Sequence, residues 1–484
     1  MSDNSIGSQT AELDKASARK VTMTLWLVAT GFFMQTLDTT IVNTALPSIA
    51  RSLGEAPLHM QSVVIAYSLT MALVIPASGF LADRFGTRKV FLAAIIIFTV
   101  GSLMCANSRA LWQLVSARVV QGVGGAMLLP VGRLAILRNF PRERYLPALS
   151  SLAVLGLVGP LLGPTLGGWL TDVASWHWIF LINVPIGAIG CIGCFFFMVG
   201  KPQPTVTRFD FKGYILLVLA MLSLTIALDG LAELGLQRAS VLVLLILAFA
   251  FLVSYALHST DNPASLLPLT LLKIPTFKIG LLGNLFARIG GGAMPYLLPL
   301  FLQVALGYTP FHAGLMMLPV AAAGIASKRV IVAMITAYGY RTVLVSNTVL
   351  AGLSMASFAF VDPQQPLWVR LLQLAFFGAV NSNQFTAMNA LTLKDLDTVG
   401  ASSGNSLFSL TQMLSMSLGV TVAGAMLAMF GNVFSTHLQP QALPVFHSTF
   451  VCVGLITMSS AFIFAQLASD TRGIDARKTN AVED

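Results

Sequence analysis

Charged side chains are scarce in this sequence. Of its 484 residues, 10% are Asp, Glu, Lys or Arg and 56% are hydrophobic, whereas a soluble domain carries about 25% charged residues. A water-soluble fold cannot bury so much apolar surface. Apolar runs of about 20 residues recur along the chain, which is the length that a helix needs to cross a hydrocarbon core. The composition therefore predicts a helical protein that spans a membrane many times.

Cysteine is equally scarce, and the four cysteines all fall within apolar runs. Cys191 and Cys194 form a C-x-x-C pair without other metal ligands nearby, so we interpret both as packing residues. The chain also lacks a nucleophile–base set, a metal-ligand cluster and a phosphate-binding loop, so we expect neither an enzyme nor a metal site. Its basic residues are dispersed among short loops, and we therefore expect no nucleic-acid partner.

Fourteen apolar segments are candidates for membrane spans. Their predicted bounds are 22–46, 59–81, 90–107, 111–131, 146–170, 178–199, 212–229, 240–258, 277–303, 311–327, 341–360, 366–391, 400–430 and 445–468. The loops and tails on one side carry 22 Lys and Arg residues, and those on the other side carry four. Such a bias predicts that both termini are cytoplasmic.

These spans predict an all-α integral membrane protein with two six-helix bundles and two extra helices. The predicted parts are a cytoplasmic tail at 1–21, a first bundle at 22–199, a linker at 200–211, two inserted helices at 212–258, a proline-broken interfacial segment at 259–276, a second bundle at 277–468 and a tail at 469–484. A weak repeat, with basic and glycine-containing stretches at 79–89 and 328–341, indicates related halves, as is common in transporters.

One aspartate, Asp38, lies deep inside the first predicted span. A charge at this depth costs at least about 2.5–3.5 kcal/mol on insertion scales, so we expect it to be functional. Arg118 lies similarly deep in the fourth span and shares a helix face with Gln121 and Gly125. Small residues on that face allow close packing. We expect Arg118 to face an acid or a cavity, and Asp38 is its best candidate partner.

Two further motifs predict conformational elements. The loop after the second span matches G-x-L-a-D-r-x-G-x-R, which predicts a tight helix–turn–helix in which Asp83 pairs with a neighbouring arginine or lies near a helix N-terminus. Its residues are Gly79, Asp83, Arg84, Gly86 and Arg88. In the fifth span, glycines recur every four residues beside two prolines, which predicts a hinge or seal between the two bundles. Its residues are Gly156, Gly159, Pro160, Gly163, Pro164 and Gly167.

Polar side chains inside the other spans are candidates for a substrate cavity, although each could instead form a hydrogen bond between helices. These candidates are Gln35, Asn43, Tyr67, Gln121, Arg288, Asn381, Gln384, Asn405 and Gln412. Arg288 stands out because it leaves the membrane interior with two cations, Arg118 and Arg288, against the one anion of Asp38.

Together, the loop after span 2, the arginine motif of span 4 and the glycine–proline motif of span 5 resemble those of the major facilitator superfamily. The run Leu37–Pro47 and the fourteen spans are most similar to its fourteen-helix drug:proton antiporter branch (DHA2), and within it to enterobacterial multidrug transporters. The resemblance covers residues 22–468. It implies a monomer in the bacterial inner membrane that exchanges protons for a small-molecule substrate by alternating access.

The resemblance also implies roles for individual residues. Asp38 and Arg118 match the family's proton-coupling residues, and the proton gradient supplies the energy without a cofactor. Several members that export cations carry further acids in spans 10 and 13, and this chain has none there. Three functions therefore remain: a drug exporter, an exporter of an organic anion or metal chelate, and a membrane receptor or scaffold that does not transport.

Overall fold

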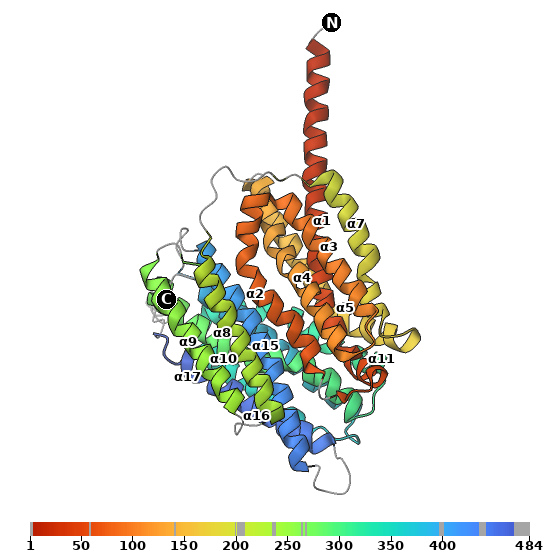
Figure 1. Cartoon of the computed structure of the whole chain (residues 1–484), viewed down its shortest axis with the longest axis vertical. Coiled ribbons are helices and arrows are strands. Elements are labelled where there is room, and N and C mark those ends of the chain that lie inside the picture. The colour runs from red at the N-terminus through yellow and green to blue at the C-terminus, as the bar shows by residue number, and fades with distance from the viewer. Residues whose placement is uncertain are drawn as a thin grey trace, which may run out of the picture.

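A computed structural model gives the arrangement of the helices (Figure 1). It describes residues 3–57, 60–139, 142–198, 200, 209–234, 239–262, 265–266, 269–395, 401–434 and 442–468, and no residue in these ranges lies in a β-strand. The predicted C-terminal tail and most of the predicted linker lie outside the described residues, as do the side chains of the predicted N-terminal tail.

Helices follow one another with short connections along the whole chain. The first half contains α1 (Asp3–Leu53), α2 (Gln61–Phe85), α3 (Thr87–Ala106), α4 (Leu111–Asn139), α5 (Arg142–Val173), α6 (Trp178–Leu181) and α7 (Asn183–Phe197). Next come α8 (Phe211–Leu234), α9 (Ala239–Asp261) and the 3₁₀ helix η2 (Leu269–Lys273). The second half contains α10 (Pro275–Val304), α11 (Pro310–Leu315), α12 (Leu318–Ala326), α13 (Lys328–Ala356), η3 (Ser357–Phe360), α14 (Leu367–Leu393), α15 (Ala401–Phe434), α16 (Ala442–Ser459) and α17 (Ala461–Phe464).

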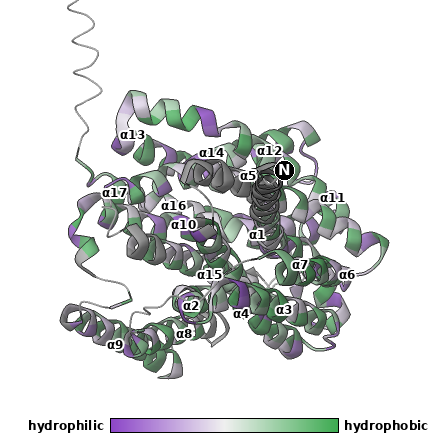
Figure 2. Cartoon of the chain, turned by 90° about the horizontal axis from the view of Figure 1, so that it is seen from above, coloured by the Kyte–Doolittle hydropathy of each residue, from purple (hydrophilic) through white to green (hydrophobic). Residues whose placement is uncertain are grey.

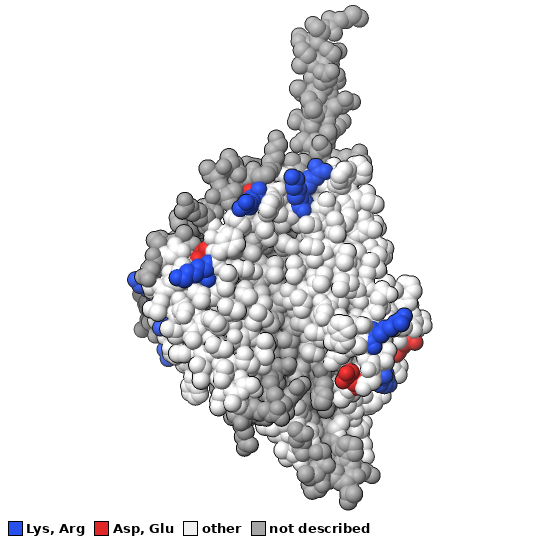
Figure 3. All heavy atoms as spheres, viewed as in Figure 1, with Lys and Arg blue, Asp and Glu red and all other residues white. Residues whose placement is uncertain are grey.

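These helices confirm the all-α membrane fold with fourteen spans. Among the described residues, ten helical segments are long and apolar enough to cross a membrane. Three predicted spans are each divided into two shorter helices: α6 and α7, α11 and α12, and α16 and α17. On the face shown in Figure 3, the middle band in front of α2 and α3 is uncharged, and Lys, Arg, Asp and Glu gather above and below it, as expected where lipid surrounds a protein.

Each half is a bundle with its own contacts. In the first half α1 packs on α5, α4 and α7, and in the second half α10 packs on α14, α15 and α16. The two extra helices stand outside both bundles: α8 contacts α2 of the first half and α15 of the second half, and α9 packs on α8 (Figure 2). Most of α9 is exposed and apolar, with Ile246 and Phe249 at its outer face. The inserted pair therefore covers the seam between the halves from the lipid side.

Each half contains a turn made by a glycine, and the two glycines have similar backbone angles. Gly86, between α2 and α3, has φ 88° and ψ 145°, and Gly339, within α13, has φ 76° and ψ 164°. This left-handed backbone region favours glycine, because a side chain would clash there. The second turn corrects the sequence prediction: Lys328–Tyr338 is not a cytoplasmic loop but a helical continuation of the preceding span, and the chain reverses only at Gly339. The charges of Lys328 and Arg329 made this helix look like a loop.

A buried carboxylate outside the spans, that of Asp210, joins the two inserted helices α8 and α9 by hydrogen bonds. Asp210, just before α8, accepts hydrogen bonds from the Gly213 amide at 3.0 Å, from His258 of α9 at 2.7 Å and from the Leu266 amide at 3.4 Å. Burial alone would raise the pKa of the Asp210 carboxyl, but these hydrogen bonds and the positive charge that His258 can carry outweigh it and hold the pKa below its ordinary value of 3.8. The charged form of Asp210 therefore stabilises the α8–α9 junction.

We expect Asp210→Asn to lower the free energy of unfolding by about 1–3 kcal/mol, because a buried charged hydrogen-bond network loses its anion. Thermal unfolding in detergent measures this loss. A depressed carboxyl pKa stabilises the fold above the unfolded pKa and ceases to do so as the pH falls through the folded pKa. The difference between the two proteins should therefore shrink below pH 3.8. Asp362→Asn, at an exposed loop acid, is the control; an equal loss there would contradict the assignment.

Candidate functional site

Asp38 lies near the middle of the membrane-spanning part of α1, Thr22–Leu53, and is fully buried, with 0% exposure. Apolar side chains precede and follow it on the helix, among them Leu37 and Ile41. A carboxylate in such surroundings cannot be hydrated, so its charge must be met by protein groups.

The first half supplies those groups from three other helices. Arg118 of α4 places Nη1 2.6 Å from Asp38 Oδ2. Gln121, one turn further along α4, donates from Nε2 to Asp38 Oδ1 at 2.7 Å. Asn183, the first residue of α7, donates to the same oxygen at 3.2 Å, and Ser102 of α3 accepts hydrogen bonds from both amides. The carboxylate is therefore held by one cation and two neutral donors.

Arg118 is as well compensated as Asp38. It is 1% exposed, and its Nη1 also donates to Gln121 Oε1 at 2.7 Å while its Nε donates to the Val63 carbonyl at 3.3 Å. The guanidinium carbon lies 4.0 Å from the centre of the Tyr67 ring, which adds a cation–π contact. The site is a closed, neutral network between α1, α2, α3, α4 and α7.

Glycines bring these helices close enough for the network to form. A Cβ on Gly101 of α3 would lie 2.6 Å from the backbone of Gln121, and one on Gly124 of α4 would meet the backbone of Phe98. A Cβ on Gly125 would lie 2.7 Å from the Tyr67 hydroxyl. Larger residues at these positions would therefore separate α4 from α2 and α3. Of these three glycines, only Gly125 belongs to the predicted small-residue face of α4.

The pairing of Asp38 with Arg118 agrees with the sequence prediction, but several neighbours do not. Tyr67 and Gln121 were expected to line a substrate cavity, and the structure buries both within this network. Ser102 and Asn183 were not predicted, although a polar residue inside an apolar run is a detectable signal. The free-energy cost of burying a neutral polar side chain in the membrane is small, so such residues are harder to identify from the sequence than the charged Asp38.

The other predicted cavity residues separate into two groups. Gln35 and Asn43 of α1 are buried, and the side-chain oxygen of each has no hydrogen-bond partner among the described residues. Arg288, Asn381 and Gln384 meet in the second half, around a cavity of about 70 Å³ between α10, α14 and α15. Gln412 adjoins this cavity, since it donates to Asn389, which also accepts from Arg288. The side chain of Asn405 lies outside the described residues.

The loop motif after α2 connects three helices at one end of the first half. Asp83 forms an ion pair with Arg138, in the last turn of α4, which corrects the predicted pairing with Arg84 or Arg88. Arg88 instead donates to the Phe195 carbonyl of α7, and Arg84 is exposed. Gly86 makes the turn. No neighbour lies within 4 Å of a Cβ built on Gly79, so close packing does not require a glycine there.

The glycine face of α5 also differs from its prediction. A Cβ on Gly159, Gly163 or Gly167 would meet Thr36, Thr40 or Thr44 of α1, so these glycines seal α5 to α1 within the first half and not to the other bundle. Pro164 is buried and Pro160 is exposed. The side-chain position at Gly156 lies outside the described residues.

The neighbouring face of α5 does meet the second half. A Cβ on Gly168 would meet the Pro310 carbonyl, and one on Gly314 would meet the Pro164 carbonyl. Thr165 Oγ1 donates to the Gly314 carbonyl at 3.1 Å. The predicted seal between the bundles is therefore made by Pro164, Thr165 and Gly168, which lie one or two positions after a glycine of the regular repeat.

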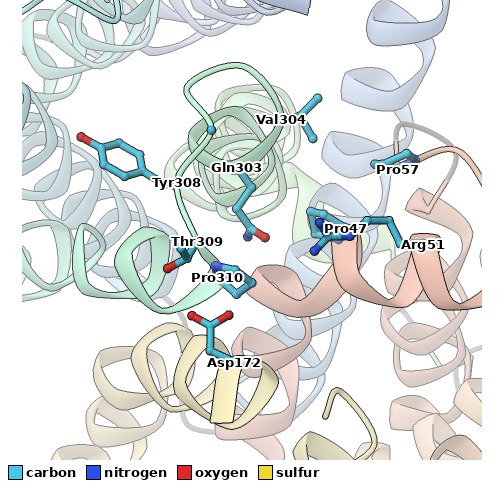
Figure 4. Close-up of a pocket in the computed structure, with 10 residues that line it drawn as sticks. Pro47, Arg51, Pro57, Asp172, Gln303, Val304, Tyr308, Thr309 and Pro310 are labelled. Atoms are coloured by element: carbon cyan, nitrogen blue, oxygen red, sulfur yellow. The ribbon is translucent and has the colours of Figure 1, made fainter. Parts of the chain in front are cut away.

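Hydrogen bonds between described residues join the halves near the end where α1 and α5 finish. Besides the bond from Thr165, Gln303 donates to the Thr44 carbonyl at 2.8 Å, and the Phe311 amide donates to Asp172 at 2.9 Å. A pocket of about 470 Å³ lies at this end, with Asp172 beside Pro310 and with Arg51 and Gln303 around it (Figure 4). The halves are thus held together at the end opposite the N-terminus (Figure 1).

Comparison with known proteins adds independent information. The family model described as Major Facilitator Superfamily matches residues 28–420. The "Putative multidrug resistance protein MdtD" of Pectobacterium atrosepticum is 48% identical over 447 residues, which cover 92% of this chain and 96% of that protein. The protein of the same name from Salmonella typhi is 49% identical over 452 residues, covering 93% and 95%.

Solved structures show the same fold at low sequence identity. A POT family transporter in complex with 5-aminolevulinic acid has a TM-score of 0.67 and 16% identity, and the match covers 92% of this chain and 95% of that one. A D-xylose-proton symporter has a TM-score of 0.64 and 15% identity, covering 94% and 99%.

We expect Gly168→Leu to prevent the halves from closing at the α5–α11 contact, because the new side chain would occupy the space of the Pro310 carbonyl. With Val304, which lines the pocket there, replaced by cysteine as a reporter, labelling by a membrane-impermeant maleimide should rise several-fold. Gly431→Leu is the matched control, since nothing lies within 4 Å of a Cβ at that glycine. We call the contacts of Thr44, Thr165 and Asp172 with the second half the gate. Equal labelling in both variants would contradict the assignment of the α5–α11 contact as part of a closed gate.

Proposed function

Because this chain belongs to the Major Facilitator Superfamily, we propose that it is a proton-coupled antiporter that exports small organic molecules by alternating access. As a member of that superfamily it is a multi-pass membrane transport protein and not an enzyme, and its substrate is a small molecule bound within the membrane. The proton gradient is its proposed energy source, with no cofactor.

The buried pair of Asp38 and Arg118 is the observation that carries the proposal. Protonation of Asp38 would leave Arg118 as a buried cation with only neutral partners. Breaking a buried ion pair by removing one charge costs about 3–5 kcal/mol. The helices that the pair joins would therefore favour a different arrangement once a proton binds, which is what coupling requires.

The position of Asp38 on α1 supports a link to the gate. Thr44, whose carbonyl accepts the hydrogen bond from Gln303 of the second half, lies six residues along α1 from Asp38, or about 9 Å at the rise of an α-helix. The same helix packs on the glycine face of α5, which also contacts the second half. A shift of α1 would reach both contacts.

Export and a drug-like cargo are supported by the relatives in Pectobacterium and Salmonella, which are named as multidrug resistance proteins.

Placement in the bacterial inner membrane with both termini cytoplasmic is supported by the excess of basic residues on one side. That excess persists after Lys328 and Arg329 are assigned to a helix. The gate contacts then lie on the periplasmic side. We also propose that the chain belongs to the DHA2 branch, that it is a monomer, and that it is divided into the parts predicted from the sequence.

We expect Asp38→Asn to abolish proton-driven transport while leaving exchange without a pH gradient intact, because the amide cannot carry the proton but fills the same space. The measurement uses purified protein in proteoliposomes with an imposed pH gradient, with ethidium and dansylglycine as cation and anion probes. Wild type should accumulate at least one of them.

Asp362→Asn, which removes a carboxylate from an exposed loop, is the matched control and should transport as wild type does. Arg118→Gln should also lose coupling, since it removes the other charge of the pair. Gradient-driven accumulation at the wild-type rate in Asp38→Asn would contradict the proposal. A folded wild type that moves neither probe would favour the alternative of a receptor or scaffold.

A further inference from the structure

Arg288 of α10 is a buried cation without an anionic partner among the described residues. Its side chain is 7% exposed. Both of its hydrogen bonds come from Nη2, to Asn284 Oδ1 at 3.2 Å and to Asn389 Oδ1 at 3.4 Å. Its Nε is buried and has no acceptor among the described residues. A guanidinium carries five donor hydrogens, and here most of them remain unused by the protein.

Arg118 shows how the same fold treats an arginine that it neutralises. That side chain has an aspartate at 2.6 Å, an amide oxygen at 2.7 Å and a backbone carbonyl at 3.3 Å. Arg288 has two longer contacts to neutral amides and no acid. Both arginines lie over an aromatic ring at 4.0 Å, Tyr67 for Arg118 and Phe385 for Arg288. The difference between them is therefore the missing anion.

No helix of the second half can supply that anion. Between Pro275 and Phe464 the sequence contains only three acidic residues, Asp362, Asp395 and Asp397. Asp362 and Asp395 lie outside the helices, and Asp397 lies outside the described residues. The helices α10, α14 and α15, which surround the cavity, contain no Asp or Glu. An unpaired charge inside a membrane protein is costly unless a partner arrives from outside.

The space for such a partner adjoins Arg288. The cavity of about 70 Å³ is lined by Arg288, Gly291, Asn381, Phe385, Met388 and Met416, among others. Gly291 keeps it open, because a Cβ there would lie 2.8 Å from the Asn381 side-chain oxygen. The Asn381 amide makes no hydrogen bond to a described residue, so it can contribute a donor beside the guanidinium. Phe385 holds the guanidinium by its face and leaves its edges free.

We propose that this cavity binds a carboxylate, or a similar oxyanion group, of the exported molecule, with Arg288 as the residue that selects it. This inference rests on the proposed export function and specifies its substrate class. Ligand pockets for whole drug-sized molecules measure about 300–1,000 Å³, so about 70 Å³ accommodates only the anionic group. The apolar remainder would lie beyond Met388 and Met416, whose flexible side chains adapt to different shapes.

The test compares two ligands that differ only in charge, dansylglycine and its neutral amide, dansylglycinamide. Binding to the full-length protein is followed by dansyl fluorescence in phosphatidylcholine vesicles without a pH gradient. Wild type should bind dansylglycine about tenfold or more tightly than the amide, as expected for a hydrogen bond to a charged group. Arg288→Gln should lose this preference and keep its affinity for the amide.

Three further variants keep the result interpretable. Arg341→Gln removes an exposed arginine after the Gly339 turn and should retain the wild-type preference. Gly291→Leu fills the cavity without changing any charge and should lose dansylglycine binding even if Arg288→Gln fails to fold. Asp362→Asn, the exposed-loop control of the transport assay, should bind both ligands as wild type does. Because binding is measured without a pH gradient and coupling is measured with one, a failure of proton coupling is separable from a failure of anion selection.

Equal affinities for the two ligands in wild type, or no binding of dansylglycine, would overturn the proposal. An unchanged preference in Arg288→Gln or Gly291→Leu would overturn it as well. Repeating the measurement with phosphatidylglycerol in the vesicles separates the two sources of anion. A cavity that takes a lipid headgroup would show dansylglycine binding that phosphatidylglycerol displaces in wild type but not in Arg288→Gln, and this outcome would overturn the assignment to the cargo.

Discussion

The ion pair between Asp38 and Arg118 is the interaction on which the first half depends. Both side chains are at most 1% exposed, so neither charge is tolerable without the other. Gln121 of α4 and Asn183 of α7 donate to Asp38, and Ser102 of α3 accepts from both of these amides. The glycines of α3 and α4 allow the backbone spacing that these bonds need. A change in the charge of Asp38 would therefore alter the hydrogen bonds between four helices, α1, α3, α4 and α7.

The path from this pair to the gate needs no long chain of coupled residues. Helix α1 carries Asp38 near the middle of its membrane-spanning part and the Thr44 carbonyl at the contact with the second half. Its threonines pack on the glycines of α5. The inserted helices α8 and α9 lie on the lipid side of α2 and α15 and leave the gate contacts free. In the proposed mechanism, rigid packing of α1 on α5 would be sufficient to connect protonation of Asp38 to the contacts between the halves.

Prediction from the sequence succeeded where placing a residue in the membrane has a large free-energy cost, and it failed where that cost is small. Apolar runs long enough to span a bilayer, and a lone buried acid with a lone deep arginine nearby, leave few alternatives, and the structure agrees with both. Asn183 and Ser102 escaped prediction because neutral polar groups cost little in a membrane. Lys328 and Arg329 misled it because charge was taken to end a span. The partner of Asp83, Arg138, lies 55 residues away in sequence, and no local pattern could identify it.

The two halves share a fold but not a charge balance, and this asymmetry bears on energetics. The first half neutralises its buried arginine internally, whereas the second half leaves Arg288 to a ligand. If that ligand is an anion leaving a cell whose interior is negative, the membrane potential favours its exit by about 2.3 kcal/mol per charge for each 100 mV. In the proposed antiport, the proton that enters moves down the same potential. An anionic cargo therefore draws on the potential twice, so one proton site at Asp38 suffices without a second acid in the other half.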